Sequence, residues 1–409
     1  MSKPKVFEKP IGVKDYLPGA VAKLRHIERD VLACMQGWGY EQIITPTIEY
    51  YDTVGVASST SDQKLFKLLN NRGTTLVLRS DMTSPIARVV SSLLKDTQFP
   101  LRLSYHANIF RAIEEEAGRE AEFFQTGVEL VGDASAEADA EVVALAIASL
   151  KAAGVERFKI AIGHVGFLNG LFEQTLTGRT DAQEQLKAYL LGRDYVGYRD
   201  QIRKLNLEAP VQQELEGIVR LRGGQEICEQ ALELSVNETA RASIRHLCDI
   251  WDVLKAYGVS EHVLIDLTMI GDFTYYTGMT FEGYAADLGF PVVSGGRYDN
   301  LLGQFGRPAP ATGFALKTTR ILELTGVKED TDVSERLLIG YDSEGREEAL
   351  AEAQKLRGQG VAVVTERMDA AEAGVAQSAL AAQKSYKGMT YTKLALFVAG
   401  MERNGGGKA

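Results

Sequence analysis

The chain has 409 residues, of which 45% are hydrophobic and 24% charged, a composition typical of a globular protein with several domains. Its net charge of −10 argues against a nucleic-acid partner, because such binding depends on neutralising phosphates. No apolar run is long enough to span a membrane, and the charged N-terminus lacks the apolar segment of a signal peptide. We therefore expect a cytoplasmic protein without a membrane partner.

The cysteines and histidines predict neither a disulfide framework nor a metal site. The three cysteines, Cys34, Cys228 and Cys248, are far apart and odd in number, and the five histidines lack ligand spacing. We expect no metal and no cofactor.

Helices and strands alternate in the first 164 residues. Apolar spacing predicts helices over residues 20–39, 84–94 and 134–153, and strands over 43–46, 74–78, 101–110, 122–131 and 158–163. The two long strands, joined by a charged loop, predict an antiparallel pair.

The pattern then becomes helical, and strands return later. Residues 165–260 are rich in leucine, glutamate, glutamine and arginine at helical spacing, which predicts an inserted helical segment. Further along, we expect strands at 263–265, 279–281 and 291–293, a helix over 312–324 and a polar linker over 326–335. The tail alternates strand, helix, strand, helix, strand from Arg336, which predicts a small α/β domain. The expected domains are 1–164 with 261–326, the insertion 165–260, and 327–409, in an α+β protein.

Six polar clusters stand at the ends of the predicted strands. They are Arg79–Thr83 (RSDMT), Phe110–Arg111 (FR), Gln125–Glu129 (QTGVE), Tyr275–Gly278 (YYTG), Gly295–Asp299 (GGRYD), and Gly313–Ala315 (GFA) with Arg320. Each cluster alone is a weak signal, since a GGRYD run could be a simple turn.

In this order and at these intervals, the clusters resemble the core of class II aminoacyl-tRNA synthetases, most closely histidyl-tRNA synthetase. GVKDYLP and ITPTIEY resemble that family's opening and its motif 1, where Pro46 would lie at a homodimer interface. LRSDMT resembles its amino-acid-binding segment, IFR its motif 2 and GFALKTTR its motif 3. YYTGMTFEGY and GGRYDNL resemble the two histidine signatures. The resemblance covers about residues 5–325 and implies an antiparallel sheet flanked by helices.

The resemblance also implies a pocket for free histidine. Asp81, Thr83 and Gln125 would hold the α-ammonium group, and Arg111 would pair with the α-carboxylate. Met82 belongs to the same segment. This set provides both charges that a zwitterion requires.

The ring of the ligand needs hydrogen-bonding partners of its own. The resemblance assigns Glu129 and Tyr275 to the imidazole and Tyr276 to the wall of the pocket.

Five positions depart from the synthetase pattern. They are Ile113 and Ala121 of motif 2 and its loop, Gly271 in place of the catalytic arginine, and Lys317 and Thr319 of motif 3. Adenylation brings a carboxylate up to a phosphate, so a cation must offset the developing charge. Glycine at 271 cannot provide it.

The residues that would bind histidine are thus kept, while those that would bind ATP are largely lost, although Arg320 remains. This combination resembles the regulatory subunit of ATP phosphoribosyltransferase, a non-catalytic paralogue of the synthetase. The resemblance implies a short-form catalytic subunit as partner, L-histidine as effector and a hetero-octamer. Two alternatives stay open: an active histidyl-tRNA synthetase, since the tail resembles a reduced anticodon-binding domain, and a free-standing histidine-binding module with another partner.

Overall fold

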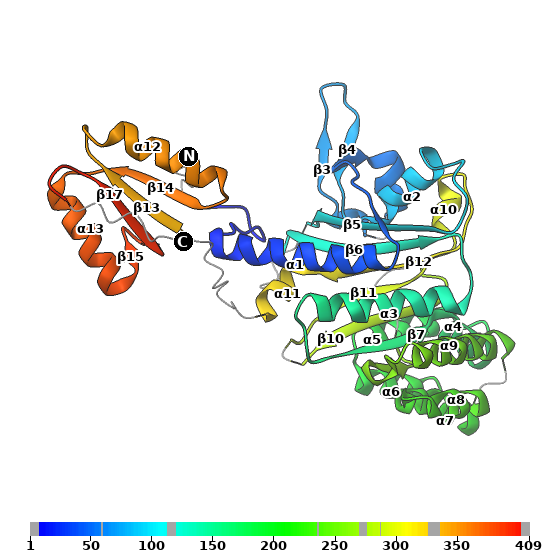
Figure 1. Cartoon of the computed structure of the whole chain (residues 1–409). Coiled ribbons are helices and arrows are strands. Elements are labelled where there is room, and N and C mark those ends of the chain that lie inside the picture. The colour runs from blue at the N-terminus through cyan, green and yellow to red at the C-terminus, as the bar shows by residue number, and fades with distance from the viewer. Residues whose placement is uncertain are drawn as a thin grey trace, which may run out of the picture. The chain divides into compact units, whose positions relative to one another are not determined.

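The computed structural model describes residues 8–58, 60–112, 120–234, 237–269, 276–286, 288–325 and 336–401. The chain forms two compact units, Met1–Gly326 and Val327–Ala409. Each unit has its own sheet and its own apolar core (Figure 1).

Nine strands in the described part of the first unit form one sheet, in the order β1-β5-β6-β12-β11-β10-β7-β9-β8. They are β1 (Glu41–Gln42), β5 (Leu101–Phe110), β6 (Glu122–Val131), β7 (Phe158–His164), β8 (Arg222–Gly223), β9 (Val263–Asp266), β10 (Met279–Ala285), β11 (Pro291–Arg297) and β12 (Ala311–Lys317). Neighbours from β5 to β7 pair antiparallel, whereas β1 runs parallel to β5 and β9 parallel to β7. The predicted antiparallel sheet is confirmed, with parallel pairs added towards its edges.

One face of this sheet, called the rear face, is apolar and covered by helices. Val128 and Leu130 of β6 and Phe314 of β12 belong to its core cluster, together with Trp251. Helices α1 (Pro18–Gly37) and α3 (Ala136–Ala152) lie along it, and α9 (Glu238–Ala256) packs on α3 (Figure 1). The alternation along β6 therefore directs Gln125 and Glu129 to the opposite face, called the site face.

The described residues of the segment predicted to be helical form six α-helices. They are α4 (Val165–Thr175), α5 (Thr180–Leu191), α6 (Tyr195–Lys204), α7 (Ala209–Gly217), α8 (Glu226–Leu234) and α9. Their buried side chains, such as Phe172 and Leu247, join the rear-face cluster. Only the two-residue strand β8 interrupts the helical pattern among the described residues of this segment, and the sequence did not predict it.

The part of the site face nearest β5 has a second apolar core. Ile86 and Val90 of α2 (Thr83–Ser92) and Leu301 of α10 (Leu301–Gln304) pack there against Leu103 and Tyr105 of β5. Beside it, a small sheet is formed by β2 (Ile48–Tyr50), β4 (Thr75–Leu78) and β3 (Lys67–Leu69). These elements leave the middle of the site face to the polar residues of β6, β12 and β11.

Two predictions for the first unit are wrong. Residues 311–317 form the strand β12, not the start of a helix, and the helix α11 (Thr318–Leu324) begins only afterwards. β12 is buried between β6 and β11 and is largely covered on both faces, so it lacks the alternation that reveals a half-buried strand. The strand expected over residues 43–46 is β1, two residues earlier.

The second unit follows the predicted alternation. β13 (Arg336–Tyr341), α12 (Arg346–Gly358), β14 (Ala362–Arg367), α13 (Ala370–Gln383) and β17 (Lys393–Phe397) form it, with strand order β14-β13-β17 and parallel pairing. The hairpin β15 (Ser385–Tyr386) and β16 (Met389–Thr390) was not predicted. The expected linker 326–335 lies outside the described residues. Among the helices of the described ranges, none combines the length and apolar character that a membrane crossing requires.

Candidate ligand-binding site

The centre of the site face is a row of paired residues from four neighbouring strands. Glu129 of β6 pairs with Gly313 of β12, which pairs with Gly296 of β11, which pairs with Thr280 of β10. A Cβ at Gly313 would lie 2.0 Å from Glu129 Oε2, and one at Gly296 would lie 2.9 Å from Tyr276 Cε1. The two glycines therefore make the space in which the Glu129 carboxyl group and the Tyr276 ring lie against the sheet.

The carboxyl group of Glu129 is buried and has two hydroxyl donors. Thr83 Oγ1 donates to Oε1 at 2.9 Å, and the hydroxyl of Tyr298 donates to Oε2. Burial raises the pKa of Glu129 to about 8, a shift that the two hydrogen bonds oppose and the charge of Asp81 reinforces. Burial therefore favours the neutral form of this carboxyl group.

The start of α2 carries the other acidic group of the site. Asp81 Oδ1 accepts the amide of Ser84 at 2.9 Å, and its Oδ2 accepts Ser58 Oγ at 2.6 Å. These bonds orient the carboxylate beside Thr83. The neighbouring Met82 side chain is 1% exposed and lies in the core cluster under α2, so its contribution is to packing.

Two further predicted residues lie at the far end of β5 and β6. Arg111 Nε donates to the carbonyl of Ser80 at 2.9 Å, and its guanidinium group is 5.6 Å from the ring centroid of Phe123. Gln125 is 5% exposed and pairs with Ala107 on one side and Lys317 on the other. Tyr276 packs beside the core of α2, and Tyr275 lies outside the described residues.

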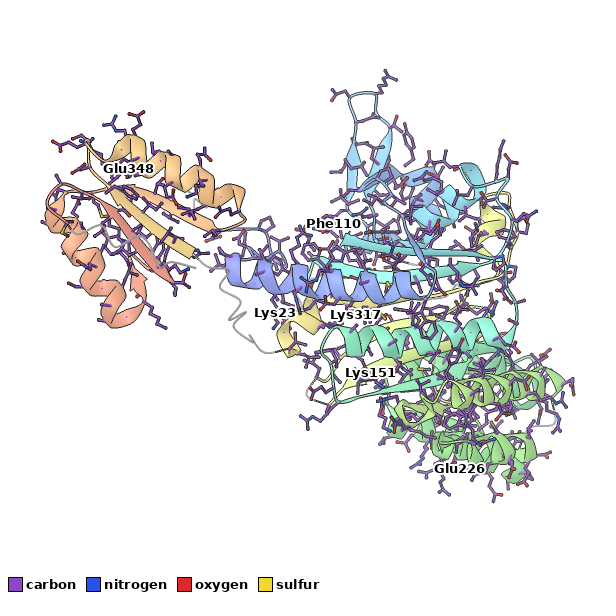
Figure 2. The ribbon with its side chains drawn as sticks, in the orientation of Figure 1. Lys23, Phe110, Lys151, Glu226, Lys317 and Glu348 are labelled. Carbon is purple, nitrogen blue, oxygen red and sulfur yellow. The ribbon has the colours of Figure 1, made fainter. Side chains whose placement is uncertain are left out.

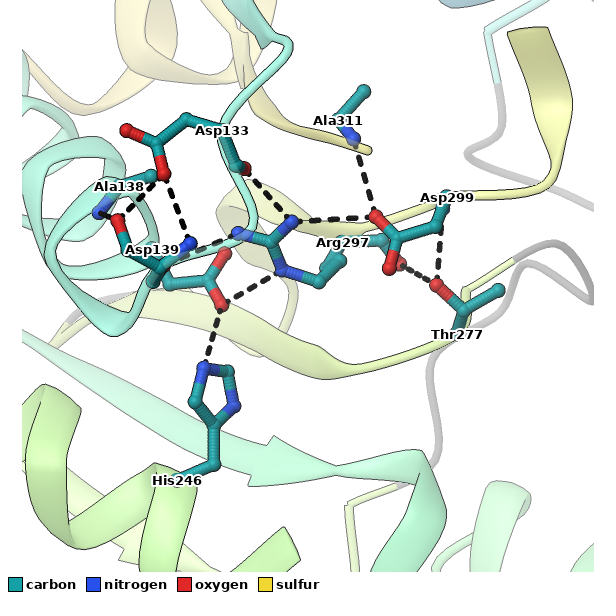
Figure 3. A network of polar contacts seen from close by, with 9 residues as sticks. Asp133, Ala138, Asp139, His246, Thr277, Arg297, Asp299 and Ala311 are labelled. Carbon is teal, nitrogen blue, oxygen red and sulfur yellow. Dashed lines mark hydrogen bonds and ion pairs between the residues drawn. The ribbon is translucent and has the colours of Figure 1, made fainter. Parts of the chain in front are cut away.

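A buried polar network on the rear face fixes the turn that carries Tyr298 (Figure 3). Arg297 Nε donates to Asp139 Oδ2 at 3.0 Å, and its Nη1 donates to Asp299 Oδ1 at 3.2 Å. Thr277 Oγ1 accepts the amide of Asp299 at 3.0 Å, and His246 Nε2 of α9 lies 3.5 Å from Asp139 Oδ2. The side chains of Arg297 and Asp139 are 5% and 0% exposed, so the ion pair is shielded from water.

Three of the five departures from the synthetase pattern can be located. Ala121 is buried, and its amide donates to the carbonyl of Gly12 at 2.7 Å. Thr319 is also buried, and its Oγ1 accepts the amide of Phe124 at 3.0 Å. Lys317 is the last residue of β12. Neither Ala121 nor Thr319 can offer a cation to a phosphate, while Ile113 and Gly271 lie outside the described residues.

Sequence reasoning missed Tyr298, which is the direct partner of Glu129. Its place inside the GGRYD run was the signal that could have identified it. It also missed Ser58, which holds Asp81 from a segment without any recognisable motif.

Comparison with known proteins finds relatives over most of the chain. A family model described as histidyl-tRNA synthetase matches residues 12–321. The chain is 46% identical over 364 residues to an ATP phosphoribosyltransferase regulatory subunit of Halalkalibacterium halodurans, covering 89% of this chain and 91% of that protein. A Bacillus subtilis protein of the same description is 44% identical over 367 residues, covering 90% and 93%.

A solved structure extends this likeness to three dimensions. It is described as an ATP phosphoribosyltransferase regulatory subunit/histidyl-tRNA synthetase from Bacillus halodurans, with a TM-score of 0.86, 42% identity and coverage of 97% of this chain and 99% of that one. Fold and site thus define a protein of the histidyl-tRNA synthetase-like class. Within that class, the chain belongs to the family of ATP phosphoribosyltransferase regulatory subunits.

Proposed function

We propose that this chain is the non-catalytic regulatory subunit of ATP phosphoribosyltransferase in histidine biosynthesis. It activates a short-form catalytic subunit, which is a glycosyltransferase, and it confers feedback inhibition by L-histidine. One observation carries the proposal: the Glu129 carboxyl group, which would be the partner of an imidazole, is buried and accepts two hydroxyl hydrogen bonds, while Ala121 and Thr319 offer no charged group to ATP. A cytoplasmic location is part of the proposal.

The charges of the site support free histidine as the effector. Asp81, which Ser58 orients, would bind the α-ammonium group, and Arg111, whose Nε donates to the carbonyl of Ser80, would bind the α-carboxylate. Glu129 would accept a ring N–H, because a carboxylate is an acceptor-only group once it is charged. Histidine can regulate the complex if the active and inactive assemblies bind it with different affinities.

A homodimer of this chain would form the core of a hetero-octamer with the catalytic subunit. The small sheet presents large apolar side chains to solvent: Ile48, Tyr50, Leu68 and Leu69 are 50%, 58%, 42% and 75% exposed. Ile44, beside Pro46, is 83% exposed. An apolar patch of this kind marks an interface, and the motif 1 resemblance assigns it to a second copy. A stable monomer in sedimentation at micromolar concentration would contradict this assignment.

The deciding experiment reconstitutes the complex. The chain and a short-form catalytic subunit are copurified with and without histidine, and the transferase rate is followed against histidine concentration. Wild type should bind the partner, raise its rate and make it sensitive to histidine. Glu129→Ala should keep the activation but raise the inhibitory histidine concentration roughly ten- to a hundred-fold, the range for a lost hydrogen bond to a charged group.

An exposed glutamate provides the matched control. Glu233→Ala on α8 makes the same substitution at an exposed position and should behave as wild type. Normal histidine binding by Glu129→Ala would show that the pocket is assigned wrongly. Weaker binding with unchanged inhibition would mean that histidine acts through the catalytic subunit. Failure to copurify with that subunit would favour a histidine-binding module with another partner.

A further inference from the structure

The α-carboxylate of an amino acid in this pocket requires a cation, and the pocket lacks one that the resembling family uses. The two acids of the proposed pocket, Asp81 and Glu129, are both buried. The arginine of the synthetases is replaced by Gly271. A carboxylate taken from water without a cationic partner would be bound poorly.

We infer that Lys317 is a further ligand-binding residue, which pairs with the α-carboxylate of histidine from the end of β12. This inference rests on the proposed function. In the resembling family a glycine stands at this position, so the substitution adds a positive charge at the end of β12.

The register of the sheet places Lys317 on the site face. It pairs with Gln125, which in turn pairs with Ala107, a member of the core cluster under α2. Directly opposite residues of antiparallel strands share a face. The next residue, Thr318, bonds through its hydroxyl to Thr126 at 2.9 Å, and Thr126 alternates with Gln125 towards the rear face. Lys317 and Gln125 therefore lie on the same side as Glu129.

Arg111 and Lys317 belong to the site face on the two strands that border β6. The amide of Arg111 donates to the carbonyl of Ala121 at 2.9 Å, which continues the β5–β6 ladder past Phe110. β6 lies between β5 and β12; Lys317 stands opposite Gln125 of β6, whereas Arg111 stands opposite Ala121, four residues before Gln125. Figure 2 shows Phe110 and Lys317 at the same end of the sheet.

Histidine is shorter than the distance between the acidic and basic ends of the proposed site, so a long cationic side chain is needed. Glu129 and Gln125 are four residues apart on β6, about 14 Å along an antiparallel strand. An imidazole bonded to Glu129 directs the ligand's backbone along this line towards Gln125. The flexible side chain of Lys317 can cover the distance that remains between β12 and the carboxylate of the ligand. The Arg111 guanidinium group is bonded to the carbonyl of Ser80 through Nε.

Calorimetry with two ligands isolates the carboxylate. Histamine has the ring and ammonium group of histidine but no carboxylate. Wild type should prefer histidine. Lys317→Met, which keeps the length without the charge, should weaken histidine binding roughly ten- to a hundred-fold and leave histamine binding unchanged. Lys317→Arg should restore most of the preference.

Lys151→Met, an exposed lysine at the end of α3, is the matched control and should leave both affinities unchanged (Figure 2). An equal loss for both ligands in Lys317→Met would overturn the inference, because it would show a structural role. An unchanged preference would overturn it as well. A wild-type chain that binds neither ligand would overturn the proposed function together with it, whereas the first two results leave that function intact.

Discussion

Tyr298, at the end of β11, donates a hydrogen bond to Glu129 of β6, and both side chains are buried. The two strands are not neighbours, since β12 lies between them. The bond crosses above Gly313, where any side chain would collide with the carboxyl group. The arrangement keeps an acid in a place where water cannot stabilise its charge.

Glu129→Gln should therefore stabilise the ligand-free chain in a pH-dependent way. The folded pKa of about 8 exceeds the ordinary value of 4.5, so the folded chain holds more protons than the unfolded chain between these limits. Wild-type stability falls as pH rises through this window, and the glutamine variant lacks that loss. The difference in melting temperature should grow from pH 4.5 to pH 8 and then level off. A constant difference would contradict the assignment.

Histidine affinity should be greatest between about pH 6.5, the ordinary pKa of an imidazole, and the pKa of Glu129 of about 8. The ion pair in the pocket contains one proton between ring and carboxylate. At lower pH both partners are protonated beforehand, so binding releases a proton. At higher pH neither is, so binding takes one up. Calorimetry in buffers of different ionisation enthalpy measures the proton release and the proton uptake. A histidine affinity that does not change with pH would rule out Glu129 as the ring partner.

We expect no histidine-dependent adenylation. Ala121 has no polar side chain, the hydroxyl of Thr319 accepts the amide of Phe124, and glycine replaces the arginine at 271. The purified chain, given histidine, ATP and labelled pyrophosphate, should show no exchange above the rate without histidine. Exchange at the rate of a synthetase would restore the synthetase alternative.

Gly313→Ala should abolish tight histidine binding. The new Cβ would lie 2.0 Å from Glu129 Oε2 and 2.4 Å from the carbonyl oxygen of Val128, so the carboxyl group must move. Overpacking of this kind typically costs about 1–3 kcal/mol of stability. Gly303→Ala in α10 is the control, because its nearest neighbour would be 4.0 Å away, at Pro308. Equal histidine affinities for the two variants would contradict the position proposed for the Glu129 carboxyl group.

Arg297→Met should lower the free energy of unfolding by about 3–5 kcal/mol, because it leaves the buried Asp139 without its cation. Arg203→Met removes an exposed partner, 3.4 Å from Asp200, and should cost about 1 kcal/mol or less. Urea denaturation compares the two. Similar costs would mean that the Arg297 network does not depend on its burial.

Sequence patterns predicted the elements that carry clear local signals. The long strands β5 and β6 match their predicted bounds, and the helices of the insertion follow from their periodicity. β12 was mistaken because a strand covered on both sides has no alternation, and its residues ATGFALK fit a helix equally well. Burial inside a sheet is decided by distant partners, which a local window does not contain.

For the site, the motifs indicated which segments converge but not which atoms meet. The run RSDMT led to Asp81 and Thr83, yet the Ser58 bond to Asp81 spans 23 residues and has no local pattern. Glu129 was predicted from the resemblance, whereas its bond to Tyr298 spans 169 residues and depends on the space above Gly313. Such contacts follow from the register of three strands.

The two tryptophans of the chain, Trp38 and Trp251, both belong to the first compact unit. Trp251 is 8% exposed in the rear-face core, and the ring of Trp38 lies 5.6 Å from that of Tyr257, centroid to centroid. The second unit contains tyrosine but no tryptophan. Indole-selective excitation therefore follows the pocket-bearing unit alone, so the chain carries an intrinsic optical label that separates the melting of its two parts.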